Sequence, residues 1–236
     1  MKVGLWFIFI AGLVASDAAS AQHELVLQRL NQENAEHTTL SETDAQKAVL
    51  DKFREISLSK GACVPTSVKI EAPIAITGDP LFFGLVLSGK VKNVWRVYAV
   101  FEGCGNKSIQ RFAVLDAADN NRLAVFVNQG RSNTSLKIMQ DTAPMAGIQA
   151  TVGARKLQPE CNGTDMELMS TQVVNEGEGL GPEVYGTRYT GSWTESWRFK
   201  TCGVSFDVPI LFTADGDRGA YTNIKGEAVR EAVVQP

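Results

Sequence analysis

Histidine is nearly absent from this chain of 236 residues, which contains only His23 and His37. Both lie in a polar stretch close to the N-terminus. A Ser-His-Asp or Cys-His nucleophilic centre would have to take its base from that stretch, and a histidine-ligated zinc site would meet the same obstacle. We therefore expect both histidines to be solvated and the chain to use no cofactor.

Several other signatures are missing as well. The sequence has no C-x-x-C pair, no glycine-rich phosphate loop and no long block of one charge. Lys and Arg number 23 against 26 Asp and Glu, which gives a net charge of −3. Binding to a nucleic acid or an anionic membrane requires a basic face on the protein, so neither is an expected partner.

The single long apolar run lies at the N-terminus. Lys2 precedes 13 apolar residues, Val3 to Ala15, and the pattern Ala19-Ser20-Ala21 follows. A membrane-spanning helix needs about 20 residues, whereas a shorter run before A-x-A is typical of a secretory signal peptide. We expect cleavage before Gln22, export to the periplasm or the cell exterior, and no stable membrane insertion of the mature chain.

The four cysteines favour disulfides in an exported chain. Cys63 and Cys104 are separated by 41 residues, and so are Cys161 and Cys202. This equal spacing favours the pairs Cys63–Cys104 and Cys161–Cys202. Pairing Cys63 with Cys161 and Cys104 with Cys202 would respect the same symmetry and stays open.

The equal spacing belongs to a longer repeat. Trp-x5-Phe-x2-Cys-Gly occurs at residues 95–105 and again at 193–203, and Pro-x3-Gly-x4-Gly occurs at 80–89 and at 182–191. Such matches are typical of duplication. We divide the chain into a signal peptide (1–21), a polar lead (22–40), a first repeat unit (41–137) and a second repeat unit (138–236).

Each unit reads as a helix followed by strands. Ser41 begins a helix whose apolar positions recur at helical spacing and which ends at Gly61. Strands are expected over 67–74, 82–88, 94–103, 108–115 and 123–128, separated by turn residues. A second helix is expected over 145–157, with Thr142 as its cap and Pro144 near its first turn.

Residues 204–213 alternate apolar and polar, which predicts a half-buried strand, and Pro209 within it suggests a sheet edge. The expected fold is therefore α+β and β-rich, with tandem units that each hold a helix and an antiparallel meander of four to five strands. Two small all-β sandwiches are the alternative.

Aromatic residues supply the candidate binding groups. Trp95, Trp193, Phe101 and Phe199 recur at matched positions of the two units, as core residues would. Trp197 has only an alanine as its counterpart, so we expect it at an exposed end of the sheet. Trp197, Tyr185 and Tyr189 are therefore the candidate binding residues.

Carboxylates supply the remaining candidates. Asp215 and Asp217 flank a glycine and could bind calcium, although a tight turn uses the same residues. Glu195 stands where the first unit has valine, so we expect it at a sheet edge or paired with an arginine. Asp207 and Glu195 are among the carboxylates that could in principle cleave a glycoside.

These observations favour a non-catalytic exported protein of a bacterial envelope or exterior that binds or assembles with a protein or a glycan. An inhibitor of a secreted enzyme is a special case of this hypothesis. The alternatives are a carboxylate-dependent hydrolase of envelope polysaccharide and a calcium- or carbohydrate-binding module.

Overall fold

A computed structural model describes residues 39–105, 107–119, 121–177, 179–226 and 229–231. The expected signal peptide, most of the polar lead and both histidines lie outside these residues. Among the described residues, no helix is both long enough and apolar enough to cross a membrane.

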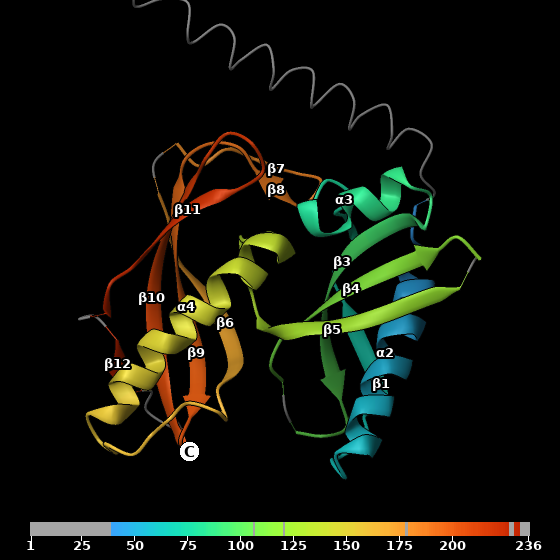
Figure 1. The fold of residues 1–236 in the computed structure, drawn as a ribbon. Helices are drawn as coiled ribbons and strands as arrows, with labels where there is room; N and C mark the ends of the chain where they lie inside the picture. The colour runs from blue at the N-terminus through green and yellow to red at the C-terminus, as the bar shows by residue number, and fades with distance from the viewer. Residues whose placement is uncertain (1–38, 106, 120, 178, 227–228, 232–236) are drawn as a thin grey trace, which may run out of the picture. The chain divides into compact units, whose positions relative to one another are not determined.

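The first half of the fold, from α2 to β5, contains two helices and five strands (Figure 1). They are α2 (Glu42–Ser59), β1 (Ser67–Ile70), β2 (Ile74–Ala75), α3 (Pro80–Leu87), β3 (Val91–Glu102), β4 (Gln110–Ala117) and β5 (Arg122–Gly130).

The second half, from α4 to β12, contains one long helix and seven described strands. They are α4 (Leu136–Arg155), β6 (Glu167–Glu176), β7 (Glu183–Val184), β8 (Thr187–Arg188), β9 (Ser192–Thr201), β10 (Val204–Ala214), β11 (Ala220–Ile224) and β12 (Arg230–Glu231).

Ten of the described strands form one sheet, whose main path runs β1-β3-β4-β5-β6-β9-β10-β11. Every described pairing in it is antiparallel except the one between β5 and β6. That parallel contact joins the halves through two residue pairs, Gln129 with Ser170 and Gly130 with Thr171. The fold is therefore α+β and β-rich, and the alternative of two all-β sandwiches is wrong.

Each half buries one helix against its own strands: α2 packs on β1, β4 and β5, and α4 on β9 and β10 (Figure 1). The Ser41 hydroxyl accepts the amide of Asp44 at 3.1 Å, which confirms the expected start of α2. On the buried side of that helix, Phe53 stacks on Phe101 with ring centroids 4.0 Å apart. Periodicity therefore identified both this helix and the face that it buries.

The strand expected over 82–88 is wrong, because these residues form most of α3. Asp79 caps this helix by accepting the amide of Leu81 at 3.0 Å, and Pro80 occupies the first turn. Aspartate followed by proline is a helix-start signal that outweighs the apolar composition of the segment. The matching Pro182 precedes the short β7–β8 hairpin instead.

The helix expected over 145–157 exists but begins much earlier, at Leu136. Ser135 caps it by accepting the amide of Ile138 at 3.2 Å, so the prediction of a Thr142 cap was wrong. Pro144 lies inside the helix. Gly147 weakens a helix in isolation, yet it lies inside α4, where a Cβ would come 1.8 Å from the Met166 sulfur and that flexible side chain would have to move.

The alternation over 204–213 is confirmed by β10, whose Phe206, Val208, Ile210 and Phe212 are all buried. The expected edge position of Pro209 is wrong, because β10 lies between β9 and the two strands β11 and β12. On that second side, β12 pairs with residues 206–207 and β11 with residues 210–214. The proline falls in the gap between them, where no described strand needs its missing N–H.

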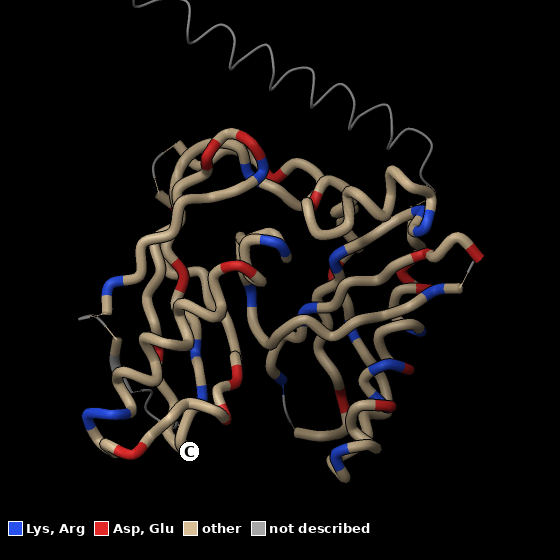
Figure 2. Tube along the Cα trace, viewed as in Figure 1, with Lys and Arg blue, Asp and Glu red and all other residues tan. Residues whose placement is uncertain are grey.

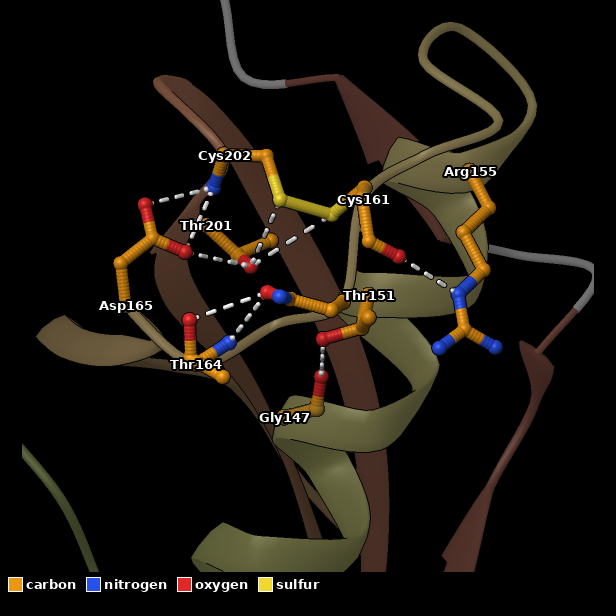
Figure 3. Close-up of a disulfide and its surroundings, with 9 residues drawn as sticks. Gly147, Thr151, Arg155, Cys161, Thr164, Asp165, Thr201 and Cys202 are labelled. Carbon is orange, nitrogen blue, oxygen red and sulfur yellow. Dashed lines mark hydrogen bonds between the residues drawn. A yellow bond between two sulfur atoms is a disulfide. The ribbon is translucent and has the colours of Figure 1, made fainter.

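Both favoured disulfides are present, Cys63–Cys104 and Cys161–Cys202. Figure 3 shows the second one between the end of α4 and the end of β9. There the Asp165 carboxylate accepts the Cys202 amide at 2.8 Å, and the Cys161 carbonyl accepts Arg155 Nε at 2.8 Å. The Cys202 N–H lowers the pKa of Asp165. In each half, the disulfide ties the chain after the helix to the end of the central strand.

The described residues form one compact unit, and buried polar pairs cross between the halves. Arg96 Nη1 donates to both carboxylate oxygens of Glu183, at 2.8 and 2.9 Å, and both side chains are largely buried. Lysines, arginines and carboxylates are otherwise interspersed along the elements (Figure 2), as the absence of charge blocks predicted.

Candidate functional site

A polar groove of about 500 Å³ lies where the end of β5 meets β6. Its walls come from the segments around β4, β5, β6, β9 and β10, and therefore from both halves. The lining residues are Ser108, Ile109, Gln129, Gly130, Arg131, Ser170, Thr171, Gln172, Val173, Ser196, Arg198 and Asp207. Most of these residues carry a hydroxyl, amide, guanidinium or carboxylate group.

The alternation of side chains along β9 determines which of them face the groove. Successive residues of a strand point to opposite faces of the sheet. Trp193, Trp197 and Phe199 are buried and belong to the core cluster that contains the α4 residues. Ser196 and Arg198 lie between them in sequence, so they face the other side and line the groove.

Cross-strand pairing assembles a polar row over three strands. Arg198 on β9 lies opposite Ser170 on β6 and Asp207 on β10. Its Nε and Nη2 donate to the two oxygens of Asp207, both at 2.8 Å. This bidentate hydrogen bonding raises the pKa of Arg198. Gln172 and Ser196 form a second opposed pair beside this row.

Arg131 supplies a second guanidinium at the β5 side of the groove. It forms a salt bridge with Glu71, and that carboxylate raises its pKa. Its Cζ also lies 4.9 Å from the centroid of the Tyr98 ring, within the range of a cation–π contact. Both arginines of the groove are thus oriented by fixed partners.

Where β5 and β6 form the wall of the groove, their backbones lie very close together. Asn128 Nδ2 donates to Thr171 Oγ1 at 2.7 Å, and that hydroxyl donates to the Arg131 carbonyl at 2.9 Å. Gly130 has a φ of +89°, and a Cβ there would lie 2.0 Å from the Thr171 carbonyl oxygen. Only glycine fits this position, because both the dihedral angle and the contact exclude a side chain.

Glu195 lies on the opposite face of β9 and is completely buried. Its Oε1 accepts the amide of Asn133 at 2.7 Å and the indole N–H of Trp193 at 3.0 Å. Its Oε2 accepts the Ser132 hydroxyl at 2.8 Å and the indole N–H of Trp197 at 2.7 Å. Burial raises the pKa of Glu195, although these donors act in the other direction.

The expectation that Glu195 lies at a sheet edge was wrong. The expectation of an arginine partner holds only in part, because the charge of Arg111 acts on the carboxylate but the two form no salt bridge among the described residues. The residue lies in a strand with neighbours on both sides, and it accepts hydrogen bonds from two indoles and from the loop before α4. The same loop is held from the first half, since Arg111 Nη2 donates to the Thr134 carbonyl at 2.9 Å. Glu195 therefore positions this loop and has no access to a ligand in the groove.

The candidate aromatic residues do not gather at one exposed surface. Trp197 is completely buried and Tyr189 is 5% exposed, so the expectation of an exposed Trp197 was wrong. An indole whose N–H bonds a buried carboxylate belongs inside the fold. Tyr185 is half-buried, has a φ of +46°, and its carbonyl accepts the Gly78 amide at 3.0 Å.

Asp215 and Asp217 lie in the turn between β10 and β11. Asp215 Oδ1 accepts the amides of Asp217 at 2.8 Å and Gly219 at 3.0 Å, which is what an aspartate does in a tight turn. Within the described part of the chain, no group of three or more His, Cys, Asp or Glu residues could hold a metal ion.

Sequence reasoning did not find the groove. Arg198, Ser196 and Gln172 look like the solvent face of ordinary strands, and nothing in their order shows that Arg131 of the other half would join them. Comparisons with family models, with curated proteins and with solved structures give no match for the chain.

Proposed function

We propose that this chain is an exported, non-catalytic binding protein whose ligand is a hydroxyl-rich glycan held in the polar groove. The observation that carries the proposal is the Arg198–Asp207 pair, partly exposed in a groove lined by serine, threonine and glutamine. A planar guanidinium and carboxylate in fixed orientation offer donors and acceptors side by side. Sugar hydroxyls both donate and accept, so they match this arrangement.

The proposal of export rests on the expected signal peptide and is supported by the two disulfides, which persist in oxidising compartments. Mass spectrometry of the secreted protein tests it. A mature N-terminus at Gln22 is expected, and retention of Met1 in the secreted chain would contradict it.

A carboxylate-dependent hydrolase is less well supported. Glycoside cleavage ordinarily uses two carboxylates on either side of the scissile bond. Asp207 is the one carboxylate among the described lining residues, and it is paired with Arg198. The other carboxylate considered, Glu195, is buried on the opposite face of the sheet.

We also propose that the two halves arose by duplication of one unit. Each half has a helix, a disulfide that closes 41 residues, and four strands in equivalent order. The pairing register supports the same proposal. Trp95 lies opposite Val114 and Trp193 opposite Phe212, so each tryptophan faces the residue 19 positions downstream.

Glycan binding is tested with soluble peptidoglycan fragments, with dextran as a comparison polysaccharide, by isothermal titration calorimetry. Wild-type protein is expected to bind one of them, and Arg198→Ala to weaken binding by about 10- to 100-fold, because a hydrogen bond to a charged group contributes about 1.5–3 kcal/mol. Ser196→Trp, which fills the groove, should abolish binding.

Arg122→Ala is the matched control. Arg122 makes the same kind of pair with Asp116, with Nε–Oδ1 at 2.7 Å, but lies outside the groove. It should bind like wild type. Equal binding by Arg198→Ala and wild type would contradict the proposed site, and wild-type protein that binds neither polysaccharide would contradict the ligand class.

A further inference from the structure

The edge of β5 that faces away from β4 is unpaired over most of its length. On one side, residues 122–129 pair with β4. On the other side, β6 pairs only with Gln129 and Gly130. No strand among the described residues pairs with this edge over residues 122–128, so it presents a row of free backbone donors and acceptors.

This edge also carries exposed apolar side chains. Leu123, Val125 and Phe126 are 56%, 48% and 37% exposed. Proteins guard free edges with lysine, proline, bulges or charged residues that point inward. Between Arg122 and Asn128, β5 has no lysine, proline or charged residue, and its one bulge, at Val127, leaves residues 123–126 in regular register.

The strands at the ends of the sheet differ in this respect. β1 is four residues long and includes Lys69, and β11 is mostly polar over Tyr221–Asn223. Short and charged or polar strands are the ordinary ways to prevent edge pairing. The contrast indicates that the β5 edge is an interaction surface.

We propose that the occupant of this edge is a second copy of the chain, paired with it as β5 against β5 in antiparallel orientation about Val125. In that register Val125 faces its own copy, Leu123 faces Val127, and Ala124 faces Phe126. Apolar residues then meet apolar residues on both faces of the new sheet. A two-fold axis closes the assembly at two chains.

A parallel arrangement is less favourable. It would place each residue beside its own copy, so the two Arg122 side chains would lie together, and like charges in register destabilise a sheet. In the antiparallel register the two Arg122 side chains lie at opposite ends of the paired segment instead. The self-complementary order of residues 123–127 therefore selects both the second copy and its direction.

The first test is analytical ultracentrifugation of the mature chain over the micromolar range. Wild-type protein is expected to form a dimer, and Val125→Lys to raise the dimer dissociation constant by about tenfold or more, because two lysines would meet at the axis. Val174→Lys is the control, since Val174 is another exposed strand valine (60%) elsewhere in the sheet.

The second test uses cross-linking and does not depend on dimer stability. All four native cysteines are in disulfides, so an introduced cysteine is the only thiol. Facing Cβ atoms in an antiparallel pair lie about 4.5–5.5 Å apart, close to disulfide geometry. Val125→Cys should therefore give a covalent dimer under mild oxidation, whereas Val174→Cys should not.

A monomeric wild-type protein would overturn the proposal. So would a dimer that Val125→Lys leaves unchanged, or equal cross-linking of the two cysteine variants. Slow hydrogen exchange of the β5 edge amides in a monomer would show that this chain covers its own edge, and that also overturns the proposal. None of these results bears on glycan binding, which rests on the groove.

Discussion

Replacing Glu195 by glutamine should destabilise the fold although the two side chains have the same shape. Each carboxylate oxygen accepts two hydrogen bonds, and three of the four donors are N–H groups, which cannot act as acceptors. Glutamine turns one of these acceptors into a donor. The Ser132 hydroxyl can rotate to accept, so the amide N–H₂ should point toward it and away from the Asn133 amide.

In that orientation the indole N–H of Trp197 loses its acceptor inside the core. A buried donor without a partner costs about 1–3 kcal/mol. For a protein of this size, about 1 kcal/mol corresponds to about 2–4 °C in Tm, so Glu195→Gln should lower Tm by about 2–12 °C. Circular dichroism during heating measures this, with the exposed Glu167→Gln as a control that should change Tm little.

The pH dependence follows from the direction of the pKa shift. Because burial raises the pKa of Glu195 in the folded state, the folded protein holds this proton more tightly than the unfolded chain. This contribution to stability is complete below the unfolded pKa of about 4.3 and is lost as pH rises through the folded pKa. Glutamine does not titrate, so Glu195→Gln should lack this pH dependence, and the stability of the wild type relative to the variant should fall as pH rises through the folded pKa.

A Glu195→Gln protein with wild-type Tm and an unchanged pH profile would refute this reasoning. It would mean that the two indoles and the loop before α4 find other acceptors. A difference that grows with rising pH would instead mean that the four donors outweigh burial and lower the pKa.

Three further predictions concern single positions, each measured by urea unfolding. Trp197→Ala should cost about 3–5 kcal/mol, as much as Trp193→Ala, because both indoles are buried; tolerance of the first alone would contradict its placement. Gly130→Ala should destabilise the protein by about 1 kcal/mol or more, since its φ of +89° and its contact with Thr171 both oppose a side chain. Gly105→Ala is the control and should cost less, because Gly105 has a φ of +72° but open space around it. Asp79→Ala should cost about 2–4 kcal/mol, because it removes a helix cap and leaves further buried amides without an acceptor; a loss within experimental error would refute its role.

The parts of the fold that sequence predicted are those fixed by local patterns. The Ser41 cap, the spacing of apolar residues in α2 and the alternation in β10 each depend on neighbours in the chain. The cysteine pairing followed from a repeat, which relates distant residues without any knowledge of contacts. In each of these cases one pattern in the sequence determined the prediction, and no other pattern in the same residues pointed to a different structure.

The errors arose where tertiary contacts decide between local options. The segment after Pro80 is apolar enough for a strand, but Asp79 makes it a helix. Gly147 weakens a helix in isolation, yet it lies inside α4 with the Met166 side chain packed against it. Trp197 was expected at an exposed end because its counterpart is alanine, but it is buried, and Glu195 beside it accepts its N–H.

The groove could not be predicted for a different reason. Its residues are ordinary polar strand positions, and they form a site only because a two-residue parallel contact places β5 beside β6. No periodicity encodes that contact.

Asp79 also bears on the order in which the chain folds. Besides capping α3, its carboxylate accepts the amides of Leu136 and Lys137, the first turn of a helix that begins 57 residues later. A chain is synthesised from its N-terminus, so this acceptor can be in place before the helix that uses it emerges. The first half would thus present the acceptor for the start of α4 before α4 itself is made, whereas a circularly permuted chain that begins with the second half would make α4 before that acceptor exists.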